Sequence, residues 1–113
     1  MKERKIWKIR VVKPYPEAHN HLIIGEVLQE TATWVRIKGR TYHFGRSVDQ
    51  LRHVRVGRHE VRIVPWTRIE IVNELPASFD VARAKLVTDG KGTVALKHDR
   101  FASPIVVNHK DAG

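Results

Sequence analysis

Arginine, lysine and tryptophan alternate with apolar residues near the middle of the chain, most clearly over residues 34–38, which read Trp-Val-Arg-Ile-Lys. Successive side chains of a β-strand point to opposite faces, so the two apolar residues are predicted to face inward and Trp34, Arg36 and Lys38 outward. Outward cations can bind phosphates, and an outward indole offers a ring for base stacking, worth about 1–3 kcal/mol per base. The pattern therefore predicts a nucleic-acid-binding face.

The same alternation in neighbouring segments adds further basic and aromatic residues to this face. A register shift of one residue would instead turn Trp34 inward, where it would pack in the core. Either Trp34 or Tyr42 would provide the stacking ring. The predicted nucleic-acid-binding residues are Lys8, Arg10, Trp34, Arg36, Lys38, Arg40, Tyr42, Arg55, Arg62 and Arg68.

The charge of the chain is concentrated in its first two thirds. The 113 residues include 21 Lys and Arg against 12 Asp and Glu, a formal net charge of +9. Residues 1–72 hold 15 of the basic and 7 of the acidic residues. A basic surface attracts polyanions and gains affinity by releasing their counterions, although net charge also serves solubility alone. Its concentration in one region favours a binding role.

The histidines offer a second kind of chemistry. His19 and His21 alternate on one predicted strand and could bind a metal ion with Glu17 or the distant His43. The chain has no cysteine and no second closely spaced histidine pair, so surface histidines or phosphate contacts are favoured over a metal site. No recognisable nucleophile set is present either. We predict a protein that is not an enzyme and has no metal or cofactor.

The elements that position these residues are predicted to be short strands. A first strand is expected over residues 6–12 and a second over residues 21–28, separated by a proline-containing loop. A third strand, residues 33–38, is predicted to turn at Lys38-Gly39-Arg40 and form a tight hairpin with residues 41–44.

The following segment is predicted to form another hairpin. Residues 53–56 would turn at Gly57-Arg58 into residues 59–64, with their valines and isoleucine inward. Pro65 would interrupt the strand ladder before residues 68–72 resume it. The inward residues would be Val54, Val56, Val61 and Ile63, and the outward ones His53, Arg55, Glu60 and Arg62.

These elements predict a mostly β protein, a small, strongly bent, open β-barrel over residues 1–75. Residues 76–113 are predicted to form a C-terminal extension that packs on the barrel, with a polar tail compatible with disorder. Residues 78–88 fit a short helix or part of a hairpin, and the hairpin is preferred. The capping-box spacing of residues 47–50 also predicts a helical turn carrying Val48 and Leu51.

The segment from Gly25 to Ile37 resembles the second and third strands of Sm-like proteins, in which a curved, glycine-bearing strand leads into a bent partner. The resemblance implies a five-stranded barrel that assembles through strand edges into a ring and binds RNA. Thr31 and Val35 stand where the family usually has Asp and Asn, and its later Arg-Gly pair is missing. The resemblance therefore implies the fold and not the uridine pocket, and another SH3-like barrel fits equally well.

The preferred function is non-catalytic binding of RNA or single-stranded DNA. The alternative is a structural module that forms a homo-oligomer through its strand edges and binds an acidic protein partner. No window approaches the roughly 20 apolar residues of a membrane span, so no membrane partner or signal peptide is expected. The absence of cysteine is compatible with a cytoplasmic location.

Overall fold

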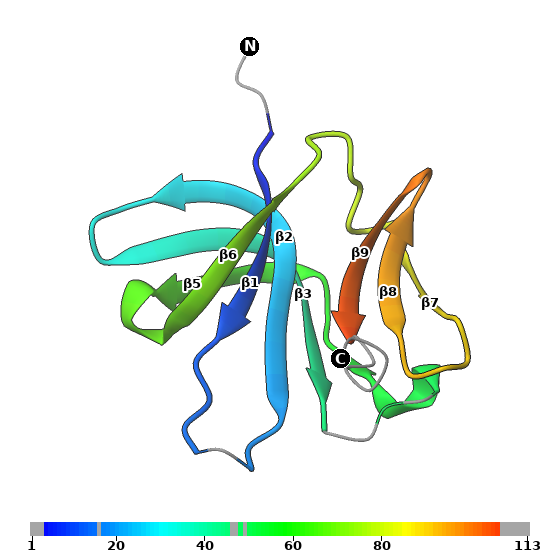
Figure 1. Ribbon diagram of the computed structural model, residues 1–113. Coiled ribbons are helices and arrows are strands. Elements are labelled where there is room, and N and C mark those ends of the chain that lie inside the picture. Colours follow the sequence, from blue (N-terminus) through cyan, green and yellow to red (C-terminus); the bar gives the residue numbers. More distant parts are fainter. Residues whose placement is uncertain (1–3, 16, 46–47, 49, 107–113) are drawn as a thin grey trace.

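The computed structural model describes residues 4–15, 17–45, 48 and 50–106. In this part of the chain all regular structure is strand apart from two 3-10 turns, which confirms the mostly β class (Figure 1). The strands form two antiparallel sheets, a large one of six strands and a small one of three. No helix among the described residues has the length and apolar character needed to cross a membrane.

The large sheet has the strand order β4-β3-β2-β1-β6, and β5 pairs with β3 beside β4. The 3-10 turn η2 (Trp66–Arg68) joins β5 to β6, yet no pairing between these two strands is found in the described residues. Hydrogen bonding therefore leaves the sheet open, and closure into a barrel stays a prediction. The strands are β1 (Ile6–Val11), β2 (Asn20–Glu30), β3 (Trp34–Phe44), β4 (Arg55–Val56), β5 (Glu60–Pro65) and β6 (Ile69–Leu75).

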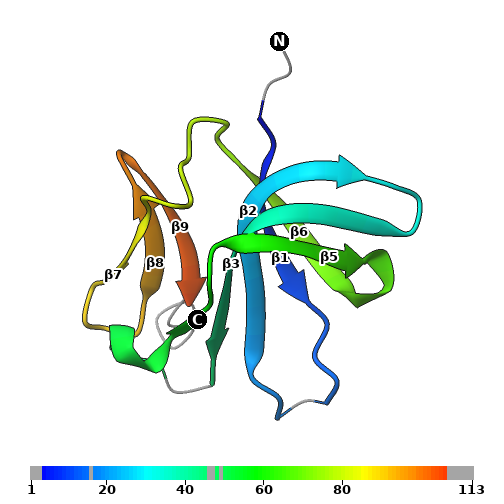
Figure 2. The same ribbon diagram turned by 180° about the vertical axis from the view of Figure 1, so that it is seen from behind.

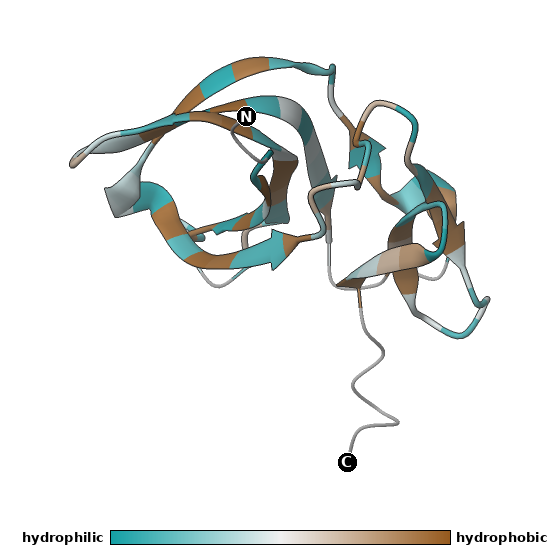
Figure 3. Ribbon diagram, turned by 90° about the horizontal axis from the view of Figure 1, so that it is seen from above, coloured by the Kyte–Doolittle hydropathy of each residue, from teal (hydrophilic) through white to brown (hydrophobic). Residues whose placement is uncertain are grey.

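The large sheet curls around one core and carries a second core on its other side (Figure 3). We call the side that bears Ile9, Ile23 and Val35 the inner face, and the opposite side the outer face. The inner core consists of Trp7, Ile9, Val11, Ile23, Val35, Ile37 and Val64. The outer core joins Ile6, Leu22, Ile24, Tyr42 and Phe44 to Val48, Val54, Phe79, Val81, Val94, Leu96 and Ile105.

β3 is one continuous strand, so the predicted hairpin turn at Gly39 is wrong. Gly39 pairs with Gly25 of β2 in mid-strand. A Cβ atom on Gly39 would collide with the carbonyl oxygen of Ile24 and with Cα of Gly25. Glycine is therefore required here by the close approach of two strands and not by a turn.

β4 and β5 do not pair with each other as predicted, because both pair with β3, one after the other. Cross-strand partners share a face, and Arg62 and Val64 lie opposite the inward residues of β3. Val61 and Ile63 therefore face outward, with 44% and 60% of their surface exposed. Val56 is also exposed, so the predicted orientation of this segment is wrong by one residue, while Val54 is buried as expected.

The small sheet contains β7 (Lys85–Thr88), β8 (Val94–His98) and β9 (Phe101–Val106) in that order (Figure 2). β7 and β8 form the preferred hairpin, and residues 78–88 contain no helix. In the hairpin loop the Asp89 carboxylate accepts hydrogen bonds from the backbone N–H groups of Lys91 and Thr93, at 2.7 and 3.2 Å. Gly90 there adopts a φ of 73°, which favours glycine.

The helical turn expected after β3 is the 3-10 turn η1 (Leu51–His53). Val48 is buried in the outer core, whereas Leu51 is 38% exposed. Ser47 and Asp49 of the predicted capping box lie outside the described residues.

Candidate nucleic-acid interface

Two exposed cations and two exposed apolar residues lie together on the outer face of β3 and β5. Arg36 pairs across the strands with Ile63, and Lys38 pairs with Val61. Side chains at such positions lie about 4.5–5.5 Å apart at Cβ. Arg36 and Lys38 are exposed, and within the described residues neither makes an ion pair or a side-chain hydrogen bond. We call Trp34, Arg36, Lys38, Val61 and Ile63 the outer strip.

Trp34 starts β3 at one end of this strip, opposite Pro65. The turn before it is fixed by Thr31, whose Oγ1 accepts a hydrogen bond from the Trp34 backbone N–H at 3.0 Å. Thr31 is itself held, because its carbonyl accepts the indole N–H of Trp66 at 2.9 Å. Trp34 is half-buried.

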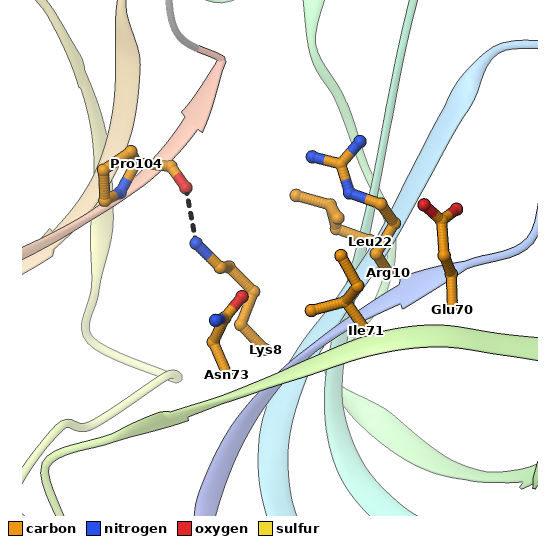
Figure 4. A pocket seen from close by; sticks show the side chains of 7 residues that line it. All are labelled: Lys8, Arg10, Leu22, Glu70, Ile71, Asn73 and Pro104. Carbon is orange, nitrogen blue, oxygen red and sulfur yellow. Dashed lines mark hydrogen bonds between the residues drawn. The ribbon is translucent and has the colours of Figure 1, made fainter.

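Lys8 and Arg10 lie elsewhere on the outer face, at a cavity of about 240 Å³ between the two sheets (Figure 4). The Lys8 ammonium donates a hydrogen bond to the Pro104 carbonyl of β9 at 2.8 Å, and Figure 4 shows it pointing at this atom. Burial, and then the charge of Arg10, lower the pKa of Lys8. Lys8 therefore links the sheets, while Arg10 has no such bond in the described residues.

Two other predicted residues of β3 are occupied by the fold. The Arg40 guanidinium donates a hydrogen bond to the Gly57 carbonyl at 3.2 Å, which fixes the segment between β4 and β5. Tyr42 is only 1% exposed, and the prediction that it stacks a base at the surface is wrong. The small sheet covers the outer face at this point, so Tyr42 belongs to the outer core, and burial raises its pKa to about 12.

Two of the three remaining arginines, Arg55 and Arg62, belong to the inner face and not to the predicted outer face, and Arg68 lies in η2, near enough to His21 to lower its pKa. Arg55 pairs with the inward His43, and Arg62 pairs with the inward Ile37. Arg62 donates to the Gly39 carbonyl at 2.8 Å and forms an ion pair with Glu60 at 3.0 Å. The predicted outward orientation of Arg55 and Arg62 is therefore wrong.

Histidines that the binding prediction omitted accompany these arginines. The rings of His21 and His43 are stacked with centroids 4.0 Å apart. Burial lowers the pKa of His21 to about 4, with further contributions from the positive charges of His43, Arg62 and Arg68. Burial also lowers the pKa of His43, with Arg55 as the next cause. We call His21, His43, Arg55, Arg62 and Arg68 the histidine–arginine cluster.

The structure thus divides the ten predicted residues among the outer strip, the cavity between the sheets, the fold itself and the histidine–arginine cluster. Val61 and Ile63 were missed because their apolar character indicated burial. His21 could have been recognised from its alternation with Ile23, since both face inward on β2. Among the described residues, no group of three or more His, Cys, Asp or Glu is arranged to hold a metal ion.

Comparison with known proteins does not place the chain in a family. No family model, no curated protein and no solved structure matches the chain.

Proposed function

We propose that this protein binds single-stranded nucleic acid, RNA or DNA, without catalysing a reaction, and that the outer strip is the contact surface. The observation that supports this proposal most directly is the pairing of the exposed cations Arg36 and Lys38 with the exposed apolar residues Ile63 and Val61. Single strands are bound by cations that follow the phosphates together with flat or apolar side chains that contact the bases.

Each member of the strip has a role in this proposal. Arg36 and Lys38 are two residues apart on one face, a separation of about 7 Å, and contact phosphates. Trp34 presents the exposed part of its ring to a base. Val61 and Ile63 contact the apolar faces of bases or sugars, which accounts for apolar side chains that face solvent beside two charges.

We further propose that the large sheet is a small open barrel of the SH3-like or Sm-like kind. Support comes from its order, in which β6 returns to pair with β1 after one 3-10 turn. In this view residues 1–75 form the barrel, and residues 76–113 form the extension whose small sheet covers part of its outer face.

Fluorescence polarisation with labelled single-stranded RNA, single-stranded DNA and duplex DNA at several salt concentrations tests the function. We expect binding of single strands that weakens steeply with salt, because phosphate contacts release counterions. The double variant Arg36→Ala/Lys38→Ala should weaken binding to all sequences alike. It should also lower the slope of log K against log salt by about 1.4, since each single-strand contact contributes roughly 0.7.

The matched control removes two charges from the small sheet. Lys85 and Lys97 are exposed cross-strand partners on β7 and β8, so Lys85→Ala/Lys97→Ala changes the net charge equally. We expect this variant to bind nearly as well as the parent protein. Equal loss in both double variants, or binding that ignores salt, would refute the outer strip as the site.

One observation favours the alternative of an assembly module. In the described residues β5 and β6 each pair along one edge only, and both carry exposed isoleucines, Ile63 and Ile71. Unpaired edges of this kind can join copies of a chain. A mass in solution of several chains, with no nucleic-acid binding near physiological salt, would support that function instead.

A further inference from the structure

The histidine–arginine cluster is not used by the proposed function, because it lies on the inner face and the outer strip lies on the opposite one. Four elements bring it together: His21 comes from β2, His43 from β3, Arg55 from β4 and Arg62 from β5. Arg68 joins from η2, where its carbonyl accepts the backbone N–H of Val12 at 2.8 Å and so ties η2 to the end of β1.

Most of the hydrogen-bonding capacity of this cluster is unused. Nε2 of His21 is buried without a hydrogen-bond partner in the described part of the chain. Arg55 and Arg68 make no side-chain hydrogen bond or ion pair with the described residues. A buried polar atom without a partner costs free energy, and one is expected to be satisfied by water, an ion or a ligand.

The charge of the cluster is also unbalanced. Glu60 is the carboxylate paired with it, and that ion pair engages Arg62, which also donates to the Gly39 carbonyl. Arg62 is therefore held in place as a fixed positive charge. Among the described residues, three arginines against one carboxylate leave a net charge of two before either histidine is protonated. A cluster with this charge and several hydrogen-bond donors is complementary to a small anion with several acceptor atoms.

We propose that the histidine–arginine cluster binds a phosphate group carried as a monoester or as free phosphate. Arg55 and Arg68 would bind its oxygens, and the fixed charge of Arg62 beside the stacked pair of His21 and His43 would add to the attraction. A phosphate group of this kind carries about −1.5 to −2 charges at pH 7, which balances the surplus of the cluster, whereas a carboxylate would balance half of it. The occupant is either inorganic phosphate or the terminal phosphate of a nucleic-acid strand.

A bound anion should raise the pKa of His21, because it favours the protonated imidazole. The groups that face His21 are all included in this expectation. They are His43 on β3, Arg62 with Glu60 on β5, Arg68 on η2, and, through His43, Arg55 on β4 and His19 before β2. All but Glu60 are basic, so an anion would offset the repulsion that, after burial, lowers the pKa of His21.

The first test is NMR of the histidine Cε1–Hε1 signals in the full chain during titration with inorganic phosphate, with chloride at equal ionic strength as the reference. We expect saturable shifts of His21 and His43 and a raised pKa of His21 in phosphate. His53, exposed on η1, is the internal reference that should not shift saturably. Absence of saturable shifts at His21 and His43 would overturn the proposal, and this measurement needs no variant.

Variants then separate this site from the outer strip. Arg55→Ala and Arg68→Ala should each weaken phosphate binding about tenfold or more, since each removes a charge-assisted hydrogen bond. Arg36→Ala/Lys38→Ala should leave phosphate binding unchanged, even if the proposed nucleic-acid binding is lost or was never present. Equal phosphate affinity in Arg68→Ala and the parent protein would contradict the assignment.

A second pair of probes distinguishes the two sources of phosphate. A short oligonucleotide with a 5′-phosphate and the same oligonucleotide with a 5′-hydroxyl are compared for displacement of inorganic phosphate. Displacement by the phosphorylated strand alone identifies a strand end as the occupant. Displacement by neither, with inorganic phosphate still bound, identifies free phosphate as the occupant.

Discussion

Replacement of Gly39 by alanine should destabilise the protein, because the new methyl group would clash with the backbone of β2. Gly39 and Gly25 are cross-strand partners in the middle of the antiparallel pair of β2 and β3. The added Cβ would meet backbone atoms of Ile24 and Gly25, which cannot move aside as a flexible side chain could. The Gly39 carbonyl also accepts the Arg62 guanidinium at 2.8 Å, so separation of the strands would disturb that bond as well.

The change in the free energy of unfolding follows from two opposing contributions. Overpacking of a tight site costs about 1–3 kcal/mol, and the cost should lie near the upper end of this range because the neighbouring atoms belong to the rigid backbone. Alanine in place of glycine recovers about 0.4–1 kcal/mol by restricting the unfolded chain. The net loss is roughly 2 kcal/mol, which lowers the melting temperature of a domain of this size by about 8 °C.

Urea denaturation followed by circular dichroism measures this loss, and Gly45→Ala is the matched control. A Cβ on Gly45 would make ordinary contact with the His19 ring at 3.8 Å. This variant should therefore be as stable as the parent protein or slightly more stable. Equal stability of Gly39→Ala and Gly45→Ala would refute the close approach of β2 and β3 at Gly39.

Two further predictions concern stability. The free energy of unfolding should fall as the pH drops from about 6.5 to about 4, because the unfolded chain binds a proton that His21 resists in the fold. After allowance for partial solvent screening this loss of stability is about 1–2 kcal/mol. Urea denaturation across this pH range should show a smaller loss for a His21→Gln variant. An equal loss in the variant and the parent protein would contradict the role of His21. Trp66→Phe removes the indole N–H bond to the Thr31 carbonyl and should cost about 1 kcal/mol. Thermal melts should show a smaller loss for Trp34→Phe, whose indole has no such partner in the described residues, and an equal loss would contradict the role of this bond.

The sequence predicted those features that depend on local alternation. β1 and β2 lie where expected, and the faces of Trp34, Arg36 and Lys38 agree with the period of two, because the residues that alternate with them, Val35 and Ile37, are apolar and buried. The hairpin of β7 and β8 was also predicted, since its Asp-Gly loop supplies both a side-chain acceptor and a residue that tolerates positive φ. These signals lie within a few residues of the structure they determine.

The wrong predictions concern residues whose orientation is determined by a segment distant in the sequence. Gly39, flanked by two basic residues, has the local pattern of a turn, and only its pairing with Gly25 shows that it is mid-strand. Tyr42 alternates as an outward residue should, yet the small sheet from the end of the chain covers it. Around Arg62 the odd-numbered and the even-numbered residues of β5 both include apolar side chains, so alternation alone does not tell which set faces inward. The pairing of Val64 with the inward Val35 turns the even-numbered residues inward and leaves Ile63 exposed. The division of the candidate site between two faces follows from these three positions.

The outer core can be completed only late in biosynthesis, because it combines residues from both ends of the described chain. Its residues on β2 and β3, such as Leu22 and Tyr42, leave the ribosome well before their partners on β8 and β9, such as Leu96 and Ile105. At about 5–20 residues per second, the roughly 60 residues from β3 to β9 take about 3–12 s to synthesise. During this interval the apolar residues of β2 and β3 lack their partners from the small sheet, so the nascent protein is open to chaperone binding and aggregation at this stage.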